Sequence, residues 1–387
     1  ATNIAETSIT IEGIKYVIDA CMIKVRDYDP ATTLDSLQVM PESRAQARQR
    51  CGRAGRVSAG KCFRLVTEES FREDMAETST PEILRCNLSS VVLQMKAMGI
   101  DNILGFDFMD KPSTAGLLRA QQQLTMLGAI EVEDKRGNIT DLGRLMVRFP
   151  TDPMAARAIV RGIQLNVAAD VCAVIAMLSA DGSLFAATKN GGGAHVENRS
   201  KFAKPLGDHV TLLHVFDAYR RQPVKERQNW CESSGLNAKQ MARTLDVFGQ
   251  LMEVTEAVAE DLHAKAAGLT PQKRHRSEAN RVGLIATPLS KHDAEREHEQ
   301  LRMALAAGYF MNSAYFSHQT NTYVTFVGTK PVYLHPSSVL FRSKQPPTTV
   351  VFHSVVSTTK NFMREVVGVR PEFLQLAAPQ LFRSVVA

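Results

Sequence analysis

The segment QRCGRAGR, residues 49–56, combines three arginines with two glycines in eight positions. Glycine permits a tight backbone path and lets a ligand approach the chain closely. Arg53 and Arg56 lie three residues apart, so a helical turn would direct both guanidinium groups to one side. Two such groups suit a phosphate chain, which arginine binds through bidentate, charge-assisted hydrogen bonds. Gln49 adds an uncharged amide that can orient a water molecule, as glutamines do in phosphoryl transfer.

The alternative interpretation of these arginines is a solvated basic loop that only touches nucleic acid.

A second phosphate-binding pattern is rejected. Residues 55–62, GRVSAGKC, approach the G-x-x-x-x-G-K-[ST] loop of NTPases, but Cys62 stands where a hydroxyl must bind Mg²⁺. The predicted context is also reversed, because a helix precedes this segment and a strand follows it.

Basic residues are concentrated in two regions that lie far apart in the sequence. Residues 43–64 carry seven Lys/Arg and no acid, and residues 308–387 carry seven Lys/Arg against two acids. This distribution suits a polyanion such as nucleic acid, whose affinity comes largely from phosphate neutralisation. The net charge of +6 is modest, so charge alone leaves an ordinary basic protein equally open.

Several classes of protein and site are not indicated. No run of about 18 apolar residues could span a bilayer, and the first residues, ATNIAETS, lack the regions of a secretory signal. The six cysteines are scattered without C-x-x-C pairs, which predicts reduced thiols and no metal site. His318, His335 and His353 likewise show no metal-binding spacing. The absence of a starting Met suggests a piece of a longer protein.

The elements that must position the arginines are predicted to belong to an α/β domain over residues 1–78. They are strands over 14–19 and 60–66, a hairpin over 22–40 and a helix over 43–50. Ser43 is the expected N-cap of that helix, which runs into the glycine-arginine segment.

Residues 79–149 are predicted to form a winged-helix module. Helices over 88–100 and 113–130 show apolar residues at i, i+3 and i+4 and each closes at a glycine, and a hairpin over 130–143 follows. The second helix of such a module often contacts nucleic acid. Here it presents glutamines in place of a basic face, which favours a packing or spacer role.

Residues 150–307 are predicted to be mainly helical. The apolar stripes cover 153–163, 168–180, 208–222 and 237–252. Asp208 and Asn237 are expected N-caps, and the charged residues of about 256–297 are interpreted as a solvated insertion or connector. Residues 308–387 contain short β-rich runs, which predict a small OB-like barrel that grips single strands through basic loops and aromatic faces.

The sequence resembles a known family over nearly its whole length. QRCGRAGR matches the Q-R-x-G-R-x-G-R signature, motif VI, of the DEAH/RHA-type superfamily 2 helicases, and ATNIAETSITIEG resembles their motif V. TPEILRCNLSSVVLQMKAMGI, ITDLGRLMVRFPTDPM, GDHVTLLHVF, VYLHPSSVLF and STTKNFMREV fit the same family, in its spliceosomal and ribosome-biogenesis branch. The implied fold class is multidomain α/β plus α plus β. It comprises a partial RecA-like second lobe (1–78), a winged helix (79–149), a helical ratchet-like domain (150–307) and an OB-like domain (308–387).

The resemblance implies roles for single residues at a nucleotide site. Arg53 and Arg56 would contact the phosphates, with Arg56 as the arginine finger, and Gln49 would help to place the attacking water. Ser8 and Glu12 complete the implied nucleotide-binding set. The family usually has Asp where this chain has Glu12, which changes the reach of that carboxylate.

An RNA contact is implied by the motif V residues Asn3, Thr7 and Thr10, because short amide and hydroxyl groups at a turn can bond phosphate or ribose. Lys360 and Arg364 are the predicted phosphate binders of the C-terminal domain. The hairpin over 22–40 would split or guide an emerging strand, with a plain connector as the alternative.

The implied cofactor is ATP or another NTP, with Mg²⁺. No true Walker A loop, D-E-A-H or S-A-T triplet occurs in the sequence. We expect these motifs in a first RecA-like lobe upstream of Ala1. Binding of both ATP and Mg²⁺ would need that lobe, so we expect the chain alone not to hydrolyse ATP. Missing sheet strands should leave residues 1–78 poorly ordered or aggregation-prone in isolation, while residues 80–387 fold.

The predicted function is that of an ATP-dependent RNA helicase acting on single-stranded RNA in a spliceosomal or pre-ribosomal complex. The implied location is the nucleus, with the cytoplasm as an additional possibility. The resemblance implies a G-patch activator protein as a partner. It implies no binding to a membrane. The alternatives are a non-enzymatic RNA-binding scaffold derived from a helicase C-terminal half and a DNA-directed helicase.

Overall fold

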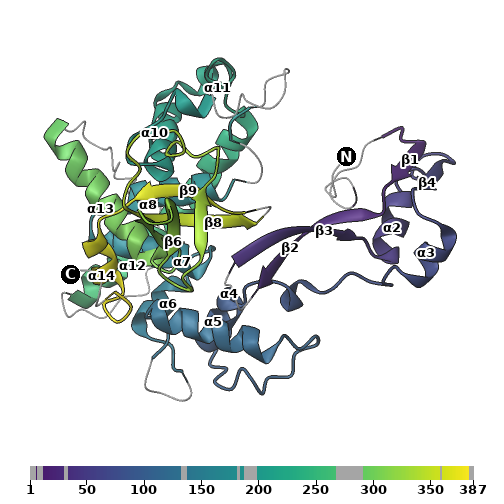
Figure 1. The fold of residues 1–387 in the computed structure, drawn as a ribbon, viewed down its shortest axis with the longest axis horizontal. Coiled ribbons are helices and arrows are strands. Elements are labelled where there is room, and N and C mark those ends of the chain that lie inside the picture. The colour runs from purple at the N-terminus through teal and green to yellow at the C-terminus, as the bar shows by residue number, and fades with distance from the viewer. Residues whose placement is uncertain are drawn as a thin grey trace. The chain divides into compact units, whose positions relative to one another are not determined.

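The computed structural model describes residues 6, 12–29, 34–131, 137–180, 184–186, 198–266, 291–357 and 360–382. The chain divides into two compact units (Figure 1). Unit 1 comprises Ala1–Leu88 and Gly105–Leu117, and unit 2 comprises Ser89–Leu104 and Leu118–Ala387. In the part of the chain that is described, no helix is long and apolar enough to cross a membrane.

Unit 1 contains a two-stranded parallel sheet of β1 (Tyr16–Asp19) and β4 (Lys61–Arg64), both shorter than predicted. Side chains alternate between the two faces of a strand. Tyr16 and Ile18 lie on one face and are 68% and 74% exposed, whereas Asp19 is buried on the other face. The helix after the hairpin packs on β1, so the apolar outer face has no described cover.

The predicted hairpin of unit 1 is confirmed. β2 (Met22–Asp29) and β3 (Leu34–Pro41) pair antiparallel, with Met22 opposite Pro41 and Asp29 opposite Leu34. Its turn near Pro30 lies outside the described residues.

The predicted helix after the hairpin is α2 (Arg44–Cys51), and its N-cap is confirmed. The Ser43 side chain accepts from the N–H of Gln46, and the Gln46 side chain accepts from the N–H of Ser43, which is a capping box. α3 (Glu68–Glu73) begins at the side-chain cap of Thr67. Cys21, Ala47 and Met75 form a small core beneath α2, against which Val66 and Phe71 pack.

The next helices are η1 (Glu82–Leu84), α4 (Ser89–Ala97), α5 (Thr114–Met126) and α6 (Asp141–Met146). The predicted glycine stops are confirmed, because Gly99 and Gly128 follow α4 and α5 with φ of +84° and +75°. Gln123 of α5 accepts a hydrogen bond from the Ser89 hydroxyl at 2.7 Å, a contact within unit 2.

The hairpin predicted over 130–143 is confirmed only in part. The described residues pair antiparallel at one bridge, between Ile130 and Ile139, and the N–H groups of Glu131 and Thr140 donate to the carbonyls of Asn138 and Ala129. The Thr140 hydroxyl then accepts from the N–H of Gly143 at 3.0 Å and starts α6, so the expected second strand becomes a helix. Residues 132–136 lie outside the described residues.

Unit 2 is mainly helical. Its further helices are α7 (Pro153–Gln164), α8 (Ala168–Leu178), α10 (Asp208–Arg221), η2 (Val224–Glu226), α11 (Arg227–Ser234), α12 (Ala238–Ala266) and α13 (Lys291–Tyr309). α8 is buried on nearly every side, because α7, α10 and α12 all pack against it. α13 packs along α7.

Two expectations about these helices are corrected. The charged residues of about 256–297 are not wholly a connector, because α12 continues to Ala266 and α13 begins at Lys291. Thr255 and Val258 explain the extension of α12, since both are buried. Asp208 is not an N-cap, because Gly207 holds that position and no side chain caps α10. Asn237 is confirmed as an N-cap, since its Oδ1 accepts from the N–H of Gln240 at 3.2 Å.

The C-terminal strands close into the predicted barrel. They are β5 (Ser313–Ser317), β6 (Thr322–Thr325), β7 (Pro331–Leu334), β8 (Thr349–Ser357) and β9 (Asn361–Gly368), in the order β5-β6-β7-β9-β8. Closure leaves no free sheet edge. β9 packs against α10 and β8 against α13, and α14 (Pro371–Ala377) packs on α13.

Candidate functional site

The segment that follows α2, residues 52–60, is called the arginine loop below. The N–H groups of Arg53 and Ala54 donate to the carbonyls of Arg50 and Cys51 at 3.1 Å, which makes two tight turns. The helical turn expected to align Arg53 with Arg56 therefore ends at Ala54. Arg56 follows in a bend and is exposed, as is Gln49 on α2.

The path of the arginine loop requires glycine where the loop meets β4. A Cβ added to Gly60 would lie 2.2 Å from the carbonyl oxygen of Ala54 and 2.6 Å from that of Lys15. Real Cβ atoms do not approach backbone oxygens so closely, hence a side chain at this position would displace the loop. A Cβ on Gly55 would meet nothing within 4 Å.

Arg53 points back towards the segment that resembles motif V. Its Nη2 donates to the carbonyl oxygen of Glu6. Its Nε and Nη1 are buried and have no acceptor among the described residues. Buried donors normally have partners, so the unused hydrogen-bonding capacity of Arg53 fits an oxyanion such as a phosphate group.

Arg50 is the residue of this region that sequence reasoning missed. Its Nε donates to Glu6 Oε2 at 2.9 Å, and its Nη1 lies 2.8 Å from Asp19 Oδ1 and 2.6 Å from Glu42 Oε2. The Arg50 side chain is 18% exposed and the three carboxyl groups are nearly fully buried. Arg50 thus ties α2 to β1, to the end of β3 and to Glu6. The available sequence signal was Glu42, an acid directly before the basic segment; nothing local marked Asp19.

The pKa values of Asp19 and Glu42 are shifted in opposite directions. Burial raises the pKa of Glu42 to about 8, and the hydrogen bond to Asp19 and the charge of Asp19 add to this. Burial alone would raise the pKa of Asp19, but hydrogen bonds from Glu42 and Arg50 hold it below its ordinary value. At neutral pH Glu42 is therefore protonated and donates to the Asp19 carboxylate.

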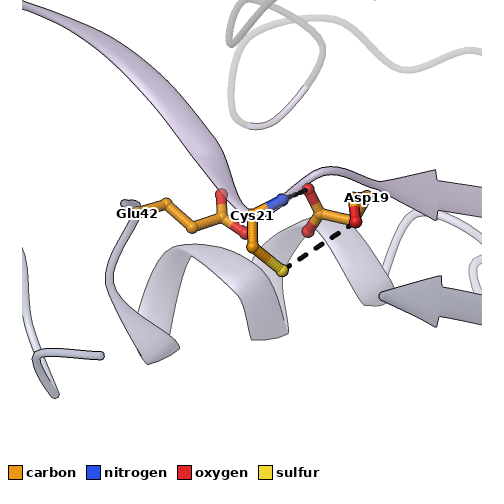
Figure 2. A group of neighbouring side chains, drawn as sticks. All are labelled: Asp19, Cys21 and Glu42. Atoms are coloured by element: carbon orange, nitrogen blue, oxygen red, sulfur yellow. Dashed lines mark hydrogen bonds between the residues drawn. The ribbon is translucent and has the colours of Figure 1, made fainter. Parts of the chain in front are cut away.

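Asp19, Cys21 and Glu42 could form a metal site by proximity, since one ligand atom of each lies within 4.8 Å of the others (Figure 2). The chemistry does not fit a metal ion. The Arg50 guanidinium already contacts both carboxyl groups. Burial, followed by the charges of Asp19 and Glu42, raises the pKa of the Cys21 thiol to about 11, so it is not a thiolate ligand. This cluster is a structural anchor and does not suit Mg²⁺.

The motif V candidates are only partly visible. Asn3, Thr7, Ser8 and Thr10 lie outside the described residues, and Glu12 is exposed in the turn before β1. Glu6 is described and buried, and it receives hydrogen bonds from both Arg50 and Arg53. Motif V and the arginine loop therefore meet at Glu6.

Lys360 and Arg364 lie on an aromatic face of the barrel in unit 2. The Lys360 ammonium lies 4.5 Å from the centroid of the Tyr333 ring. Phe362 lies 6.2 Å from Tyr333 and 5.9 Å from His335, between ring centroids. Arg364 is exposed on β9, two residues beyond Phe362. The sequence predicted the two cations but not which rings stand beside them, because the barrel register brings β7 and β9 together.

A pocket of about 360 Å³ adjoins this face. Its lining includes the basic side chains Arg199, Lys204 and Arg342 and the serines 200, 337, 338 and 343, without a carboxylate among the lining residues. The Ser337 hydroxyl lies 2.7 Å from Nδ1 of His335, which in turn contacts Phe362. Cations, hydroxyls and aromatic rings thus form one continuous surface.

The wall of the pocket is held by Asp208. Its Oδ1 accepts from the N–H of Val339 at 2.8 Å, and its Oδ2 accepts from the Ser338 hydroxyl at 2.7 Å and the N–H of Val366 at 2.8 Å. Arg199 pairs with Asp208 at 3.1 Å and with Glu365. The residue expected to cap a helix instead joins α10 to the barrel.

Three protein-family models match parts of the chain. They are the winged-helix helicase-associated domain (HA2) over residues 120–151, the ratchet-like helicase-associated domain over 152–212 and the oligonucleotide/oligosaccharide-binding fold over 301–381. The predicted winged-helix, ratchet-like and OB-fold domains are thereby confirmed.

Two curated proteins are similar over 99% of this chain. One is the pre-mRNA-splicing factor ATP-dependent RNA helicase prp22 of Schizosaccharomyces pombe, 37% identical over 383 residues, which is 30% of that protein. The other is the ATP-dependent RNA helicase DHX33 of Mus musculus, 37% identical over 385 residues, which is 50% of that protein. The chain thus spans half or less of the length of each.

Proposed function

This chain belongs to the DEAH-box RNA helicases and corresponds to their C-terminal portion, and from that premise we propose its role within a longer protein. It supplies arginines to the nucleotide site of an ATP-driven helicase and holds single-stranded RNA. The observation that carries the proposal is the junction at Glu6. Arg50 of α2 binds the Glu6 carboxyl group and Arg53 of the arginine loop binds the Glu6 carbonyl, so both meet the segment that resembles motif V at one buried residue.

In the proposed nucleotide site each residue has a separate task. ATP or another NTP supplies the phosphate oxygens when it is bound. Arg53 donates to them through the nitrogens that have no described acceptor, and Arg56 stabilises the charge that develops on the transferred group. Gln49 orients the attacking water, and Ser8 and Glu12 complete the site.

Mg²⁺ is assigned to residues outside this chain. The buried carboxyl groups of unit 1 are engaged by Arg50 and do not fit it. We therefore expect its ligands in a first RecA-like lobe of the longer protein, and we expect this chain alone not to hydrolyse ATP.

The nucleotide role is tested by Arg56→Ala in a longer protein that carries the Walker A and D-E-A-H motifs. Arginine fingers contribute about 10³- to 10⁵-fold to phosphoryl transfer. RNA-stimulated ATPase activity should fall by at least about 10³-fold, while affinity for single-stranded RNA should stay within about twofold. Arg72→Ala, at an exposed arginine of α3 paired with Glu68, is the control. Unchanged ATPase activity in the Arg56 variant would contradict the proposal.

The RNA role rests on the continuous surface of unit 2. Tyr333 and Phe362 offer rings for stacking, and Lys360 and Arg364 offer cations for the backbone. Lys204 and Arg342 extend the positive charge into the pocket, whose serines add hydroxyl donors.

The RNA role is tested on the 387-residue chain by fluorescence anisotropy with a labelled oligouridylate over a range of salt concentrations. Each phosphate that a cation of the protein neutralises contributes about 0.7 to the slope of log K against log salt. The Lys360→Ala/Arg364→Ala variant should therefore show a slope shallower by about 1.4. Lys225→Ala, at an exposed lysine of η2, should keep the wild-type slope. An unchanged slope in the double variant would remove Lys360 and Arg364 from the RNA path.

The remaining parts of the proposal follow from the family. Residues 1–78 form part of a RecA-like second lobe, whose described elements include β1, β4, α2 and α3. The hairpin over 22–40 guides a strand of RNA. The boundaries at 79–149, 150–307 and 308–387 are proposed for the three other domains. The longer protein acts in splicing or ribosome biogenesis. Its proposed location is the nucleus, with the cytoplasm as an additional location. A G-patch protein docks on the winged helix and second lobe.

A further inference from the structure

Two cysteines stand at the two ends of the arginine loop. Cys51 is the last residue of α2 and Cys62 is the second residue of β4. The Cys51 thiol is a neighbour of the Cys62 thiol and, after burial, is the next cause that raises the pKa of Cys62. Both side chains are partly exposed, whereas Cys21, Cys172 and Cys231 are buried.

Backbone contacts bring the two ends together independently of the thiols. The N–H of Ala54 donates to the Cys51 carbonyl at 3.1 Å. The carbonyl of the same Ala54 lies so close to Gly60 that only glycine fits there. Cys62 pairs with Val17 in the β1–β4 register, and Phe63 beside it is 52% exposed on the opposite face of the sheet. The alternation of β4 therefore turns Cys62 towards α2.

We propose that Cys51 and Cys62 are an oxidisable pair, and that their disulfide closes the arginine loop covalently. The oxidant is a peroxide. A thiolate of one cysteine attacks hydrogen peroxide, breaks the O–O bond and becomes a sulfenic acid, with release of hydroxide that takes up the proton lost by the thiol. The second thiol then displaces the sulfenic oxygen as water and forms the S–S bond. Overall the two thiols lose two electrons and two protons, and one peroxide becomes two waters.

The surroundings set the rate and the selectivity of this reaction. Burial and the neighbouring Cys51 raise the pKa of Cys62, while the charge of Arg64 opposes that rise. Since the thiolate is the attacking species, the pair should oxidise slowly at neutral pH and faster as the pH increases. The three buried cysteines, with no comparable partner thiol described, should remain reduced.

The disulfide would restrict the segment that contains Arg53 and Arg56. If these arginines act as proposed on a nucleotide, oxidation slows ATP turnover in the longer protein, and a dithiol reductant restores it. This consequence rests on the proposed function, whereas formation of the disulfide does not.

The experiment uses the 387-residue chain, treated with hydrogen peroxide, alkylated with iodoacetamide and digested with trypsin. The expected product joins the tryptic peptides Cys51–Arg53 and Cys62–Arg64. It is two hydrogen atoms lighter than their sum and disappears after reduction with dithiothreitol. Cys51→Ser and Cys62→Ser should each abolish it, and Cys86→Ser, at another partly exposed cysteine of unit 1, should leave it unchanged.

Separate outcomes overturn separate claims. Three results would overturn the pairing. The first is sulfinic or sulfonic acid at Cys51 or Cys62 without the joined peptide, and the second is a joined peptide that contains Cys86. The third is alkylation of both Cys51 and Cys62 under conditions in which Cys86 has already been oxidised. A joined peptide with unchanged RNA-stimulated ATPase activity in the oxidised longer protein keeps the pairing and contradicts the role of the arginine loop.

Discussion

Arg50 in unit 1, which is partly buried, and Arg199 in unit 2, which is buried, both hold carboxyl groups, but their surroundings differ. The Asp208 carboxylate beside Arg199 also accepts from two backbone N–H groups and a serine hydroxyl. Around Arg50, by contrast, Asp19 Oδ2 and Glu42 Oε1 have no conventional donor among the described residues. Burial is the main cause of the raised pKa of Glu42, and the hydrogen bond to Asp19 adds to it. Both oxygens of Asp208 thus have donors, although Arg199 Nε has no acceptor among the described residues, whereas Asp19 and Glu42 each keep an oxygen without a donor.

The sheets of the two units also differ in how completely they bury their apolar side chains. The barrel closes on itself and buries Val332, Val350 and Met363 completely. β1 and β4 form a two-stranded sheet whose outer face leaves Ile18 and Leu65 74% and 67% exposed. Two strands alone are marginally stable in water. The barrel residues are thus covered within unit 2, whereas Ile18 and Leu65 have no cover among the described residues. The poor order of residues 1–78 in isolation stays a prediction.

The largest expected effect is on the cluster in unit 2. Asp208→Ala removes the partner of a buried arginine and the acceptor of three hydrogen bonds, which should cost about 3–5 kcal/mol of unfolding free energy. Urea unfolding followed by the fluorescence of Trp230, which lies in unit 2, measures it. Glu256→Ala, at an exposed carboxylate on α12, should cost less than about 0.5 kcal/mol. If Asp208→Ala lowered the free energy of unfolding as little as Glu256→Ala, the cluster around Asp208 would not be the joint between α10 and the barrel.

The next effect concerns the backbone of unit 1. Gly60→Ala should destabilise the β1–β4 sheet by up to about 3 kcal/mol, because the clash is with backbone oxygens that cannot rotate away. Hydrogen exchange of peptides covering β1 and β4 should accelerate, while peptides of β8 and β9 should not change. Gly55→Ala, where the added Cβ meets nothing within 4 Å, is the matched control. Equal acceleration in both variants would contradict the described path of the arginine loop.

Acid should weaken unit 2 through His209. Burial lowers the pKa of His209 to about 3, and the nearby Arg199 and His353 favour the neutral ring while Glu365 opposes them. Between pH 6.5 and 3 the unfolded chain binds a proton that the folded chain does not. Stability is therefore lost as the pH falls, by about 2 kcal/mol at pH 5. His209→Leu should flatten this dependence in urea unfolding at pH 5 and pH 7, and His263→Gln, at an exposed histidine of α12, should not.

Unit 1 should respond to pH with the opposite sign. The pKa of Glu42 is raised to about 8 in the folded chain, so the folded chain binds the extra proton between pH 4.5 and 8. Its contribution to stability is present at acidic pH and is lost as the pH rises through 8. Glu42→Gln should remove this slope.

The measurement is hydrogen exchange of β1 and β4 peptides at pH 5.5 and 8.5, corrected for the intrinsic exchange rate. Glu73→Gln, at an exposed carboxylate of α3, should keep the wild-type slope. If protection from hydrogen exchange falls in the same direction with pH in unit 1 and in unit 2, the contrast between the Glu42 cluster and the His209 region is wrong.

Features whose causes lie within a few residues were predictable from the sequence. The Ser43 and Asn237 caps, the glycines that end α4 and α5 and the hairpin over 22–40 all arise from hydrogen bonds and backbone preferences of neighbouring residues. The arginine segment was recognisable for the same reason, because the spacing of its glycines and arginines is itself the signal. The basic character of the barrel was visible as composition.

Features that depend on contacts between distant residues were decided by the tertiary structure. Asp208 carries every local sign of an N-cap, yet it bonds Ser338 and Val366, which lie 130 and 158 residues away. The sequence assigned no role to Arg50, and only folding placed Glu6, Asp19 and Glu42 around it. Burial makes such charges costly unless they are paired, and only packing determines which charges become buried and which groups are near enough to pair with them.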